Sequence, residues 1–172
     1  RLLPYETEWN RDQHDSRTNI MHAVVNEASI FLSVLALPLI AAHLPGLDIW
    51  PHEWPLWLQL ALAILIADLG ITLTHFASHR FGWLWRLHAV HHAAPRLYGF
   101  NGLMKHPLHQ ALELTAGTTP LVIMGFGPDI AWLLSFAVAI QLLLQHSNVD
   151  MRIGSLGYFW AVAPAHRHHH IA

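Results

Sequence analysis

Four long apolar stretches constrain the fold of this chain more than any other feature of its sequence. A helix needs about 20 mainly apolar residues to cross a bilayer. Charged residues make up only 12% of the chain, against about 25% in a typical soluble domain. We therefore predict an all-α, integral-membrane helical bundle of about four spans, with residues 1–172 forming one domain. The predicted spans are Ala28–Leu44, Pro55–Thr74, Pro107–Met124 and Ile130–Leu144.

The positions of the Lys and Arg residues predict how these spans are oriented. Four spans place all nine Lys and Arg residues on one face, and the hairpin turns at residues 45–54 and 125–129 contain none. Positively charged loops face the cytoplasm in membrane proteins. Residues 76–106 and 147–172 should therefore form a cytosolic, histidine-rich helical cap. A soluble helical bundle, which is the alternative, offers no reason for such one-sided placement.

Histidine is unusually frequent between residues 75 and 170. Of 16 histidines, 12 lie between His75 and His170, and they form one HxxxH and two HxxHH motifs. Residues spaced by three or four positions share one face of a helix, so each motif can direct its imidazoles to one place. His146 follows the fourth apolar stretch, and His106 precedes the third. The candidate metal ligands are His75, His79, His88, His91, His92, His106, His146, His166, His169 and His170.

This many imidazoles predicts a metal centre with two ions. Nine or ten ligands exceed one coordination sphere, and imidazole suits Zn, Cu, Fe and Ni. The chain has no Cys, which excludes thiolate ligands and disulfides. Asp68 lies two helical turns before the first motif and could orient a ligand imidazole or simply line the membrane span. Asn148 could hold a metal-bound water or cap a helix, and Asp150 could offset part of the metal charge.

The order of these motifs resembles that of the fatty acid hydroxylase / sterol desaturase superfamily, and above all of its bacterial members. The resemblance extends over the whole chain, and its strongest part covers residues 68–92. Residues 106–108, 145–149 and 166–170 follow in the order of the family. Several spaced motifs in one order make the resemblance specific.

The resemblance implies a di-iron enzyme that uses O2 to hydroxylate or desaturate a fatty acyl, sterol or related lipid. By position it makes nine of the candidate histidines iron ligands and His106 an additional site residue. Eukaryotic relatives often carry a tenth ligand where this chain has Asp150. An external electron donor is implied, either a cytochrome b5-like or ferredoxin-like protein or a reductase, in a multi-pass protein of the bacterial inner membrane. The family normally continues beyond the last motif, so the complete protein is expected to extend past Ala172.

Two other functions fit parts of the sequence. A non-catalytic membrane metal-binding or transport protein would also need ligands, but transport sites usually lie near the bilayer midplane, whereas these histidines lie at the ends of the spans. A zinc-dependent membrane hydrolase would need no O2, but the chain has no HExxH motif. The formal net charge of −2 gives no surface for nucleic acid. The lipid, the position oxidised, the electron donor and the oligomeric state stay open.

Overall fold

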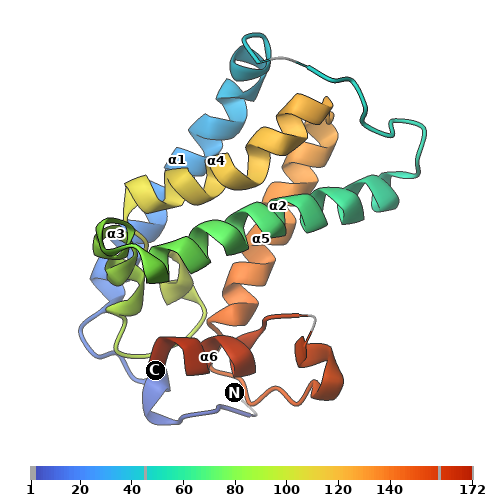
Figure 1. The fold of residues 1–172 in the computed structure, drawn as a ribbon. Helices are drawn as coiled ribbons and strands as arrows, with labels where there is room; N and C mark the ends of the chain where they lie inside the picture. Colours follow the sequence, from blue (N-terminus) through green and yellow to red (C-terminus); the bar gives the residue numbers. More distant parts are fainter. Residues whose placement is uncertain (1–2, 45, 159, 172) are drawn as a thin grey trace.

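The computed structural model describes residues 3–44, 46–158 and 160–171, and this part of the chain is helical with no β-strand (Figure 1). The all-α prediction is therefore confirmed. The α-helices are α1 (Ser16–Ala41), α2 (Leu56–Arg80), α3 (Gly82–His92), α4 (Pro107–Met124), α5 (Pro128–Gln145) and α6 (Ala163–Ile171). The short 3-10 helices are η1 (Glu8–Asn10), η2 (Phe100–Leu103) and η3 (Gly154–Tyr158).

Local sequence signals explain where α4 and α5 begin and end. Helix α4 begins at Pro107, and the His106 imidazole accepts a hydrogen bond from the N–H of Leu108. It ends at Gly125, whose φ of 85° is a left-handed conformation that favours glycine. Helix α5 begins directly afterwards at Pro128, a residue suited to a first helical turn. The observed α4 coincides with the predicted range, and α5 extends slightly beyond it at both ends.

Helix α1 begins well before the predicted start at Ala28. Its first turns are polar, so hydropathy does not mark them as part of an apolar stretch. Polar side chains of this part of α1 bind another segment of the chain. The buried Asn26 amide donates hydrogen bonds to the carbonyl oxygens of Leu103 and Lys105, at 2.8 and 3.1 Å. The beginning of α1 therefore holds the segment that leads into α4.

Helices α2 and α4 pack closely because small residues line their contact. A β-carbon on Gly70 would collide with the backbone carbonyl of Ala116, and one on Gly117 would lie 3.1 Å from the carbonyl oxygen of Ala67. Glycine and alanine let helix backbones approach closely, as they do in membrane helix pairs. The contact fixes α2 against α4 and brings the end of α2 beside the start of α4.

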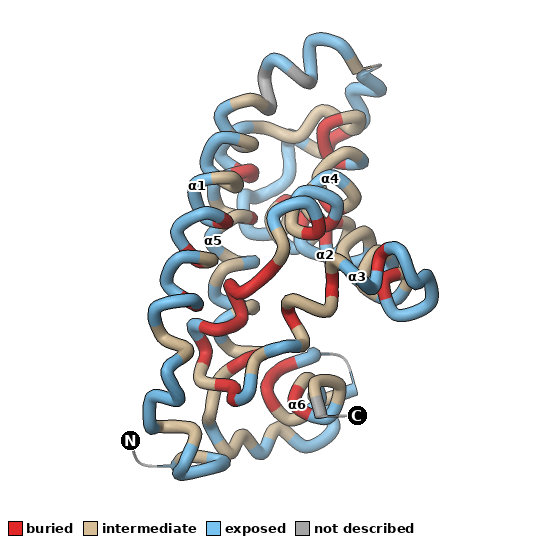
Figure 2. Tube along the Cα trace, turned by 90° about the vertical axis from the view of Figure 1, so that its left-hand side faces the viewer, coloured by how far each residue is buried: buried red, intermediate tan, exposed pale blue. Residues whose placement is uncertain are grey.

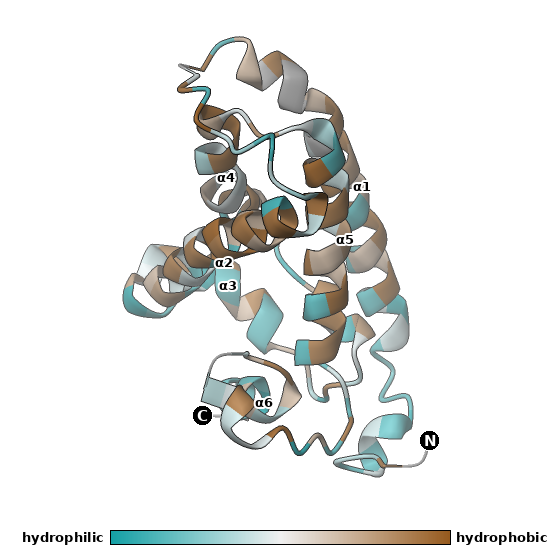
Figure 3. Ribbon diagram, turned by 90° about the vertical axis from the view of Figure 1, so that its right-hand side faces the viewer, coloured by the Kyte–Doolittle hydropathy of each residue, from teal (hydrophilic) through white to brown (hydrophobic). Residues whose placement is uncertain are grey.

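Helices α2 and α5 are long and apolar enough to cross a membrane. Only 17% of the apolar window of each helix is buried inside the molecule. Large side chains such as Leu65, Leu69 and Phe136 are more than 60% exposed, and Figure 3 shows apolar residues along both helices. Exposed apolar area of this kind is unfavourable in water and suits contact with a membrane. The spans predicted in α1 and α4, and the cytosolic position of the cap, stay predictions.

The segment between α3 and α4 is the most buried connection in the described part of the chain. Residues 101–105 are all buried (Figure 2). The guanidinium of Arg96, which is 4% exposed, binds the Asp15 carboxylate through three contacts of 2.7–3.1 Å. It also donates to the carbonyl oxygen of Trp9 at 2.9 Å and to that of Arg11. This one side chain therefore ties the N-terminal segment to the segment that follows α3.

Candidate metal centre

The described residues bring nine of the ten candidate histidines into two adjacent groups. Within each group, one ring nitrogen from every histidine lies within 4.8 Å of the corresponding atoms of the others. Neither group includes a carboxylate within the part of the chain that the structure describes. The first histidine group consists of His75, His79, His88, His92 and His169. The second histidine group consists of His91, His146, His166 and His170.

Each HxxHH motif supplies both groups. Helix α3 contributes the i, i+4 pair of its motif to the first group and the middle residue, His91, to the second. Helix α6 does the reverse and contributes its i, i+4 pair to the second group and His169 to the first. Helix α2 adds the HxxxH pair to the first group, and His146 at the end of α5 completes the second. Six histidines on two short helices thus supply both groups.

Several imidazole nitrogens lie close to two others at once, and hydrogen bonds between the histidines cannot satisfy all of these contacts. The Nε2 atom of His88 lies 3.1 Å from that of His79 and 3.0 Å from that of His92. The Nε2 atoms of His146 and His166 also have two such neighbours each, at 2.9–3.1 Å. One Nε2 atom carries either one hydrogen or one lone pair, so it can serve only one of its two neighbours. Lone pairs that converge in this way are those that a cation between them would satisfy.

The surroundings keep several of these imidazoles in the neutral form that binds metal. Burial lowers the pKa of His88 to about 2, with the nearby His75 adding to the effect. Burial also lowers the pKa of His92 and of His170 to about 3, and neighbouring imidazoles add to both shifts. Neutral imidazole is the metal-binding species, because a protonated ring has no free lone pair. The residues present therefore fit a divalent metal ion in each group.

Backbone carbonyls orient two rings of the second group. The Nδ1 atom of His146 lies 2.8 Å from the carbonyl oxygen of Leu142, and that of His91 lies 3.3 Å from that of Met104. A carbonyl only accepts, so in each ring Nδ1 carries the hydrogen and Nε2 keeps its lone pair. Partners of this kind commonly orient metal-binding histidines.

Gly102 leaves the space that the His146 ring occupies. A β-carbon on Gly102 would lie 2.5 Å from Nδ1 and 2.7 Å from Cγ of His146, which is closer than real contacts allow. Gly102→Ala is therefore expected to displace the ring and to lower the metal affinity of the second group by about 10–100-fold, as loss of a supporting contact typically does. Isothermal titration of metal-free protein with Fe²⁺ or Co²⁺ measures this. Gly127→Ala is the matched control because nothing lies within 4 Å of the added carbon, and equal affinities in the two variants would contradict the prediction.

Four buried polar residues beside the first group were not among the candidate site residues. The Nζ atom of Lys105 and the Oε2 atom of Glu113 form an ion pair of 2.5 Å. The Oγ atom of Ser78 lies 2.8 Å from Nε2 of His109. The His109 ring lies against that of His88, with 4.5 Å between centroids. A charged residue within an apolar stretch is a signal of function in itself, and Glu113 in the third stretch carried that signal.

The remaining sequence candidates lie outside both groups as the described residues place them. His106 caps the start of α4, and Asp68 is exposed on α2. The Asn148 side chain accepts a hydrogen bond from the backbone N–H of Glu6 at 3.0 Å. Asp150 forms an ion pair of 3.2 Å with Arg152. A role for these four residues in a metal site stays a prediction.

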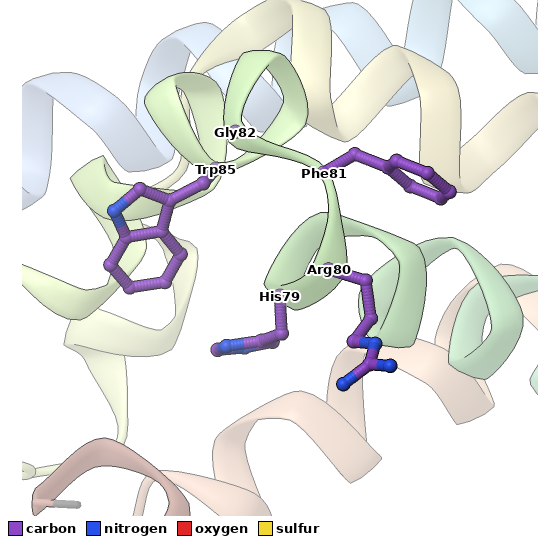
Figure 4. A pocket seen from close by; sticks show the side chains of 5 residues that line it. All are labelled: His79, Arg80, Phe81, Gly82 and Trp85. Atoms are coloured by element: carbon purple, nitrogen blue, oxygen red, sulfur yellow. The ribbon is translucent and has the colours of Figure 1, made fainter.

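An open pocket lies beside the first group, where α2 turns into α3. It is lined by His79, Arg80, Phe81, Gly82 and Trp85 (Figure 4). The Trp85 ring lies 5.3 Å from the ring of His79 and 5.4 Å from that of His92, measured between centroids. The pocket thus connects the outside of the molecule with the edge of the first histidine group.

Comparison with known proteins adds independent information on this site. A family model described as fatty acid hydroxylase matches residues 60–172, a range that includes both histidine groups. The ornithine lipid hydroxylase OlsE of Rhizobium tropici is 30% identical over 179 residues, which cover 99% of this chain and 54% of that protein. The chain therefore spans about half the length of this curated relative. No solved structure matches the chain.

Proposed function

This chain belongs to the fatty acid hydroxylase family, and on that premise we propose that it forms the metal-binding part of a membrane-bound di-iron enzyme that oxidises a lipid with O2. Hydroxylation is the favoured outcome, because the curated relative is named for the hydroxylation of a lipid. Desaturation is the related alternative. The observation that carries the proposal is the convergence of nine histidines, eight of them buried or half-buried, into two adjacent groups.

The first and second histidine groups would each hold one iron ion. When bound, the two ions would supply the reduction of O2 and the oxidation of a lipid C–H bond. The protein itself would hold the imidazoles in fixed tautomers through backbone carbonyls, and would keep them neutral by burial. It would also exclude bulk water from His88 and His146, which are both 0% exposed.

The pocket beside His79 would be the place where the lipid reaches the first group. Trp85 and Phe81 offer apolar surface there, and Arg80 offers a positive charge that suits an anionic headgroup. The exposed apolar faces of α2 and α5 would lie in the membrane, so that the acyl chain stays in the hydrocarbon while the headgroup stays near water. Electrons would come from an external donor, and the protein would be a multi-pass protein of the bacterial inner membrane with its histidines on the cytoplasmic side.

Comparison of cellular lipids tests this proposal most directly. Cells that express the full-length gene are expected to contain a lipid with one additional oxygen atom that is missing from cells without the gene. Mass spectrometry of total lipid extracts detects this difference, and a loss of two hydrogens would instead indicate desaturation. The purified protein should contain two irons and consume O2 when reduced. An active protein free of iron would contradict the proposal.

A further inference from the structure

A buried ion pair lies directly behind the first histidine group. The Nζ atom of Lys105 and the Oε2 atom of Glu113 are 2.5 Å apart, and the two residues are 8% and 2% exposed. Taking two charges out of water costs free energy that their mutual attraction often fails to return. Fold stability alone is therefore a weak reason for this pair, and its other contacts indicate what it does.

The second carboxylate oxygen of Glu113 faces two imidazoles. Oε1 lies 3.7 Å from Nδ1 of His75 and 3.8 Å from Nδ1 of His109. Both distances are slightly long for a hydrogen bond, and this buried oxygen has no closer partner among the described residues. Buried carboxylate oxygens are almost always hydrogen-bonded. One of the two imidazoles is therefore the donor that Oε1 needs, after a small shift of the ring.

The contacts of Ser78 decide which imidazole can donate. Its Oγ atom lies 2.8 Å from the carbonyl oxygen of Thr74 and 2.8 Å from Nε2 of His109. A carbonyl only accepts, so the hydroxyl hydrogen points to Thr74 and Nε2 of His109 has to donate to Oγ. A neutral His109 then has no hydrogen left on Nδ1. His75 is the remaining donor to Glu113.

We propose that Glu113 is a positioning residue for the first histidine group. Its Oε1 atom accepts a hydrogen bond from Nδ1–H of His75, while Lys105 holds the other oxygen in place. The Nε2 atom of His75, 2.7 Å from that of His169, is then the nitrogen with the free lone pair. This inference rests on the proposed metal-binding function. In this role the buried Glu113 carboxylate acts through His75 and need not touch the metal.

Two double variants of the full-length protein separate positioning from a purely structural role. Lys105→Met/Glu113→Gln and Lys105→Met/Glu113→Leu both remove the buried charges, but only Gln keeps an oxygen that can accept from His75. Titration of the metal-free proteins with Co²⁺, followed by its absorption spectrum, gives affinity and ligand geometry. We expect the Leu variant to bind about 10–100-fold more weakly than the Gln variant. The Gln variant should keep the affinity and spectrum of the wild type.

The outcomes of this experiment are distinct. Equal Co²⁺ affinities and spectra in the two double variants would overturn the positioning role, since the accepting oxygen would then make no difference. A wild-type protein that binds no Co²⁺ would overturn the metal centre and this inference with it. Unfolding temperatures of the metal-free variants should agree, which shows that a difference in binding is not a difference in folding. Lys105→Met/Glu113→Met is a second apolar variant of another shape, so the comparison does not depend on how Leu fits.

Discussion

Replacing His88 with alanine is expected to abolish iron binding in the first histidine group and to stop lipid oxidation. His88 is 0% exposed, and its Nε2 atom lies between those of His79 and His92. Loss of a residue that only supports a ligand typically costs about 10–100-fold in affinity or activity. Removal of this central imidazole should therefore cost more than about 100-fold. Iron content and the hydroxylated lipid, both measured on the full-length protein, report the two effects.

His168→Ala is the matched control for this experiment. His168 lies in the same stretch of α6 as three clustered histidines, but it is exposed and lies outside both groups as described. Its removal should leave iron content and lipid oxidation unchanged. If His88→Ala kept full iron content and full activity in a folded protein, His88 would not be a ligand. If His168→Ala were equally damaging, the loss in His88→Ala could not be assigned to the removal of a ligand.

Replacing Arg96 with methionine is expected to lower the stability of the protein by about 3–5 kcal/mol, the usual effect of leaving one charge of a buried pair without its partner. For a chain of this size that corresponds to a decrease of roughly 6–20 °C in unfolding temperature. The variant would leave the nearly buried Asp15 carboxylate unpaired, and it would free the N-terminal segment from the segment after α3. Thermal unfolding of the solubilised protein measures the change.

The pH dependence of this loss provides an additional check. The hydrogen bonds from Arg96 hold the pKa of Asp15 below its ordinary value, so the pair stabilises the wild type above about pH 4. This contribution is lost as the pH falls through the lowered pKa of the folded state. In Arg96→Met, acid would instead protonate the unpaired Asp15 carboxylate. This would remove the free-energy cost of keeping an unpaired charge inside the protein. The difference in unfolding temperature between the two proteins should therefore narrow at acidic pH.

A matched exposed pair should behave differently. Arg152 forms an ion pair of 3.2 Å with Asp150, and its side chain is 88% exposed. Exposed ion pairs typically contribute about 0–1 kcal/mol. Arg152→Met should therefore have little effect on the unfolding temperature. A loss as large as that expected for Arg96→Met would mean that burial is not what makes the Arg96 pair important.

The sequence predicted the membership of the histidine site better than its internal arrangement. The HxxxH and HxxHH spacings identify residues that share a helical face, and the nine histidines of the two groups were all among the candidates. The spacing could not show that His91 and His169 cross to the group opposite that of their neighbours, because this depends on how α3 and α6 face each other. His106 was a candidate because it precedes the third apolar stretch, but its ring instead caps the start of α4.

The residues that surround the histidine groups were harder to predict for a different reason. Lys105 looks like an ordinary cytoplasmic charge when basic residues are read as a topology signal. Only the three-dimensional structure shows that its ammonium group reaches Glu113 inside the molecule. The polar start of α1 was missed in the same way, because its helical turns are held by Asn26 and the backbone of a distant segment. Long-range contacts of this kind leave no periodic pattern in the sequence.

Because each of the two HxxHH motifs contributes to both histidine groups, the positions of the two groups are coupled. A helix that turns about its own axis moves all of its side chains together, and both α3 and α6 carry nitrogens for both groups. Neither helix can therefore turn and disturb one group while it leaves the other unchanged. The separation of the two groups therefore depends in part on the pitch of these two short helices.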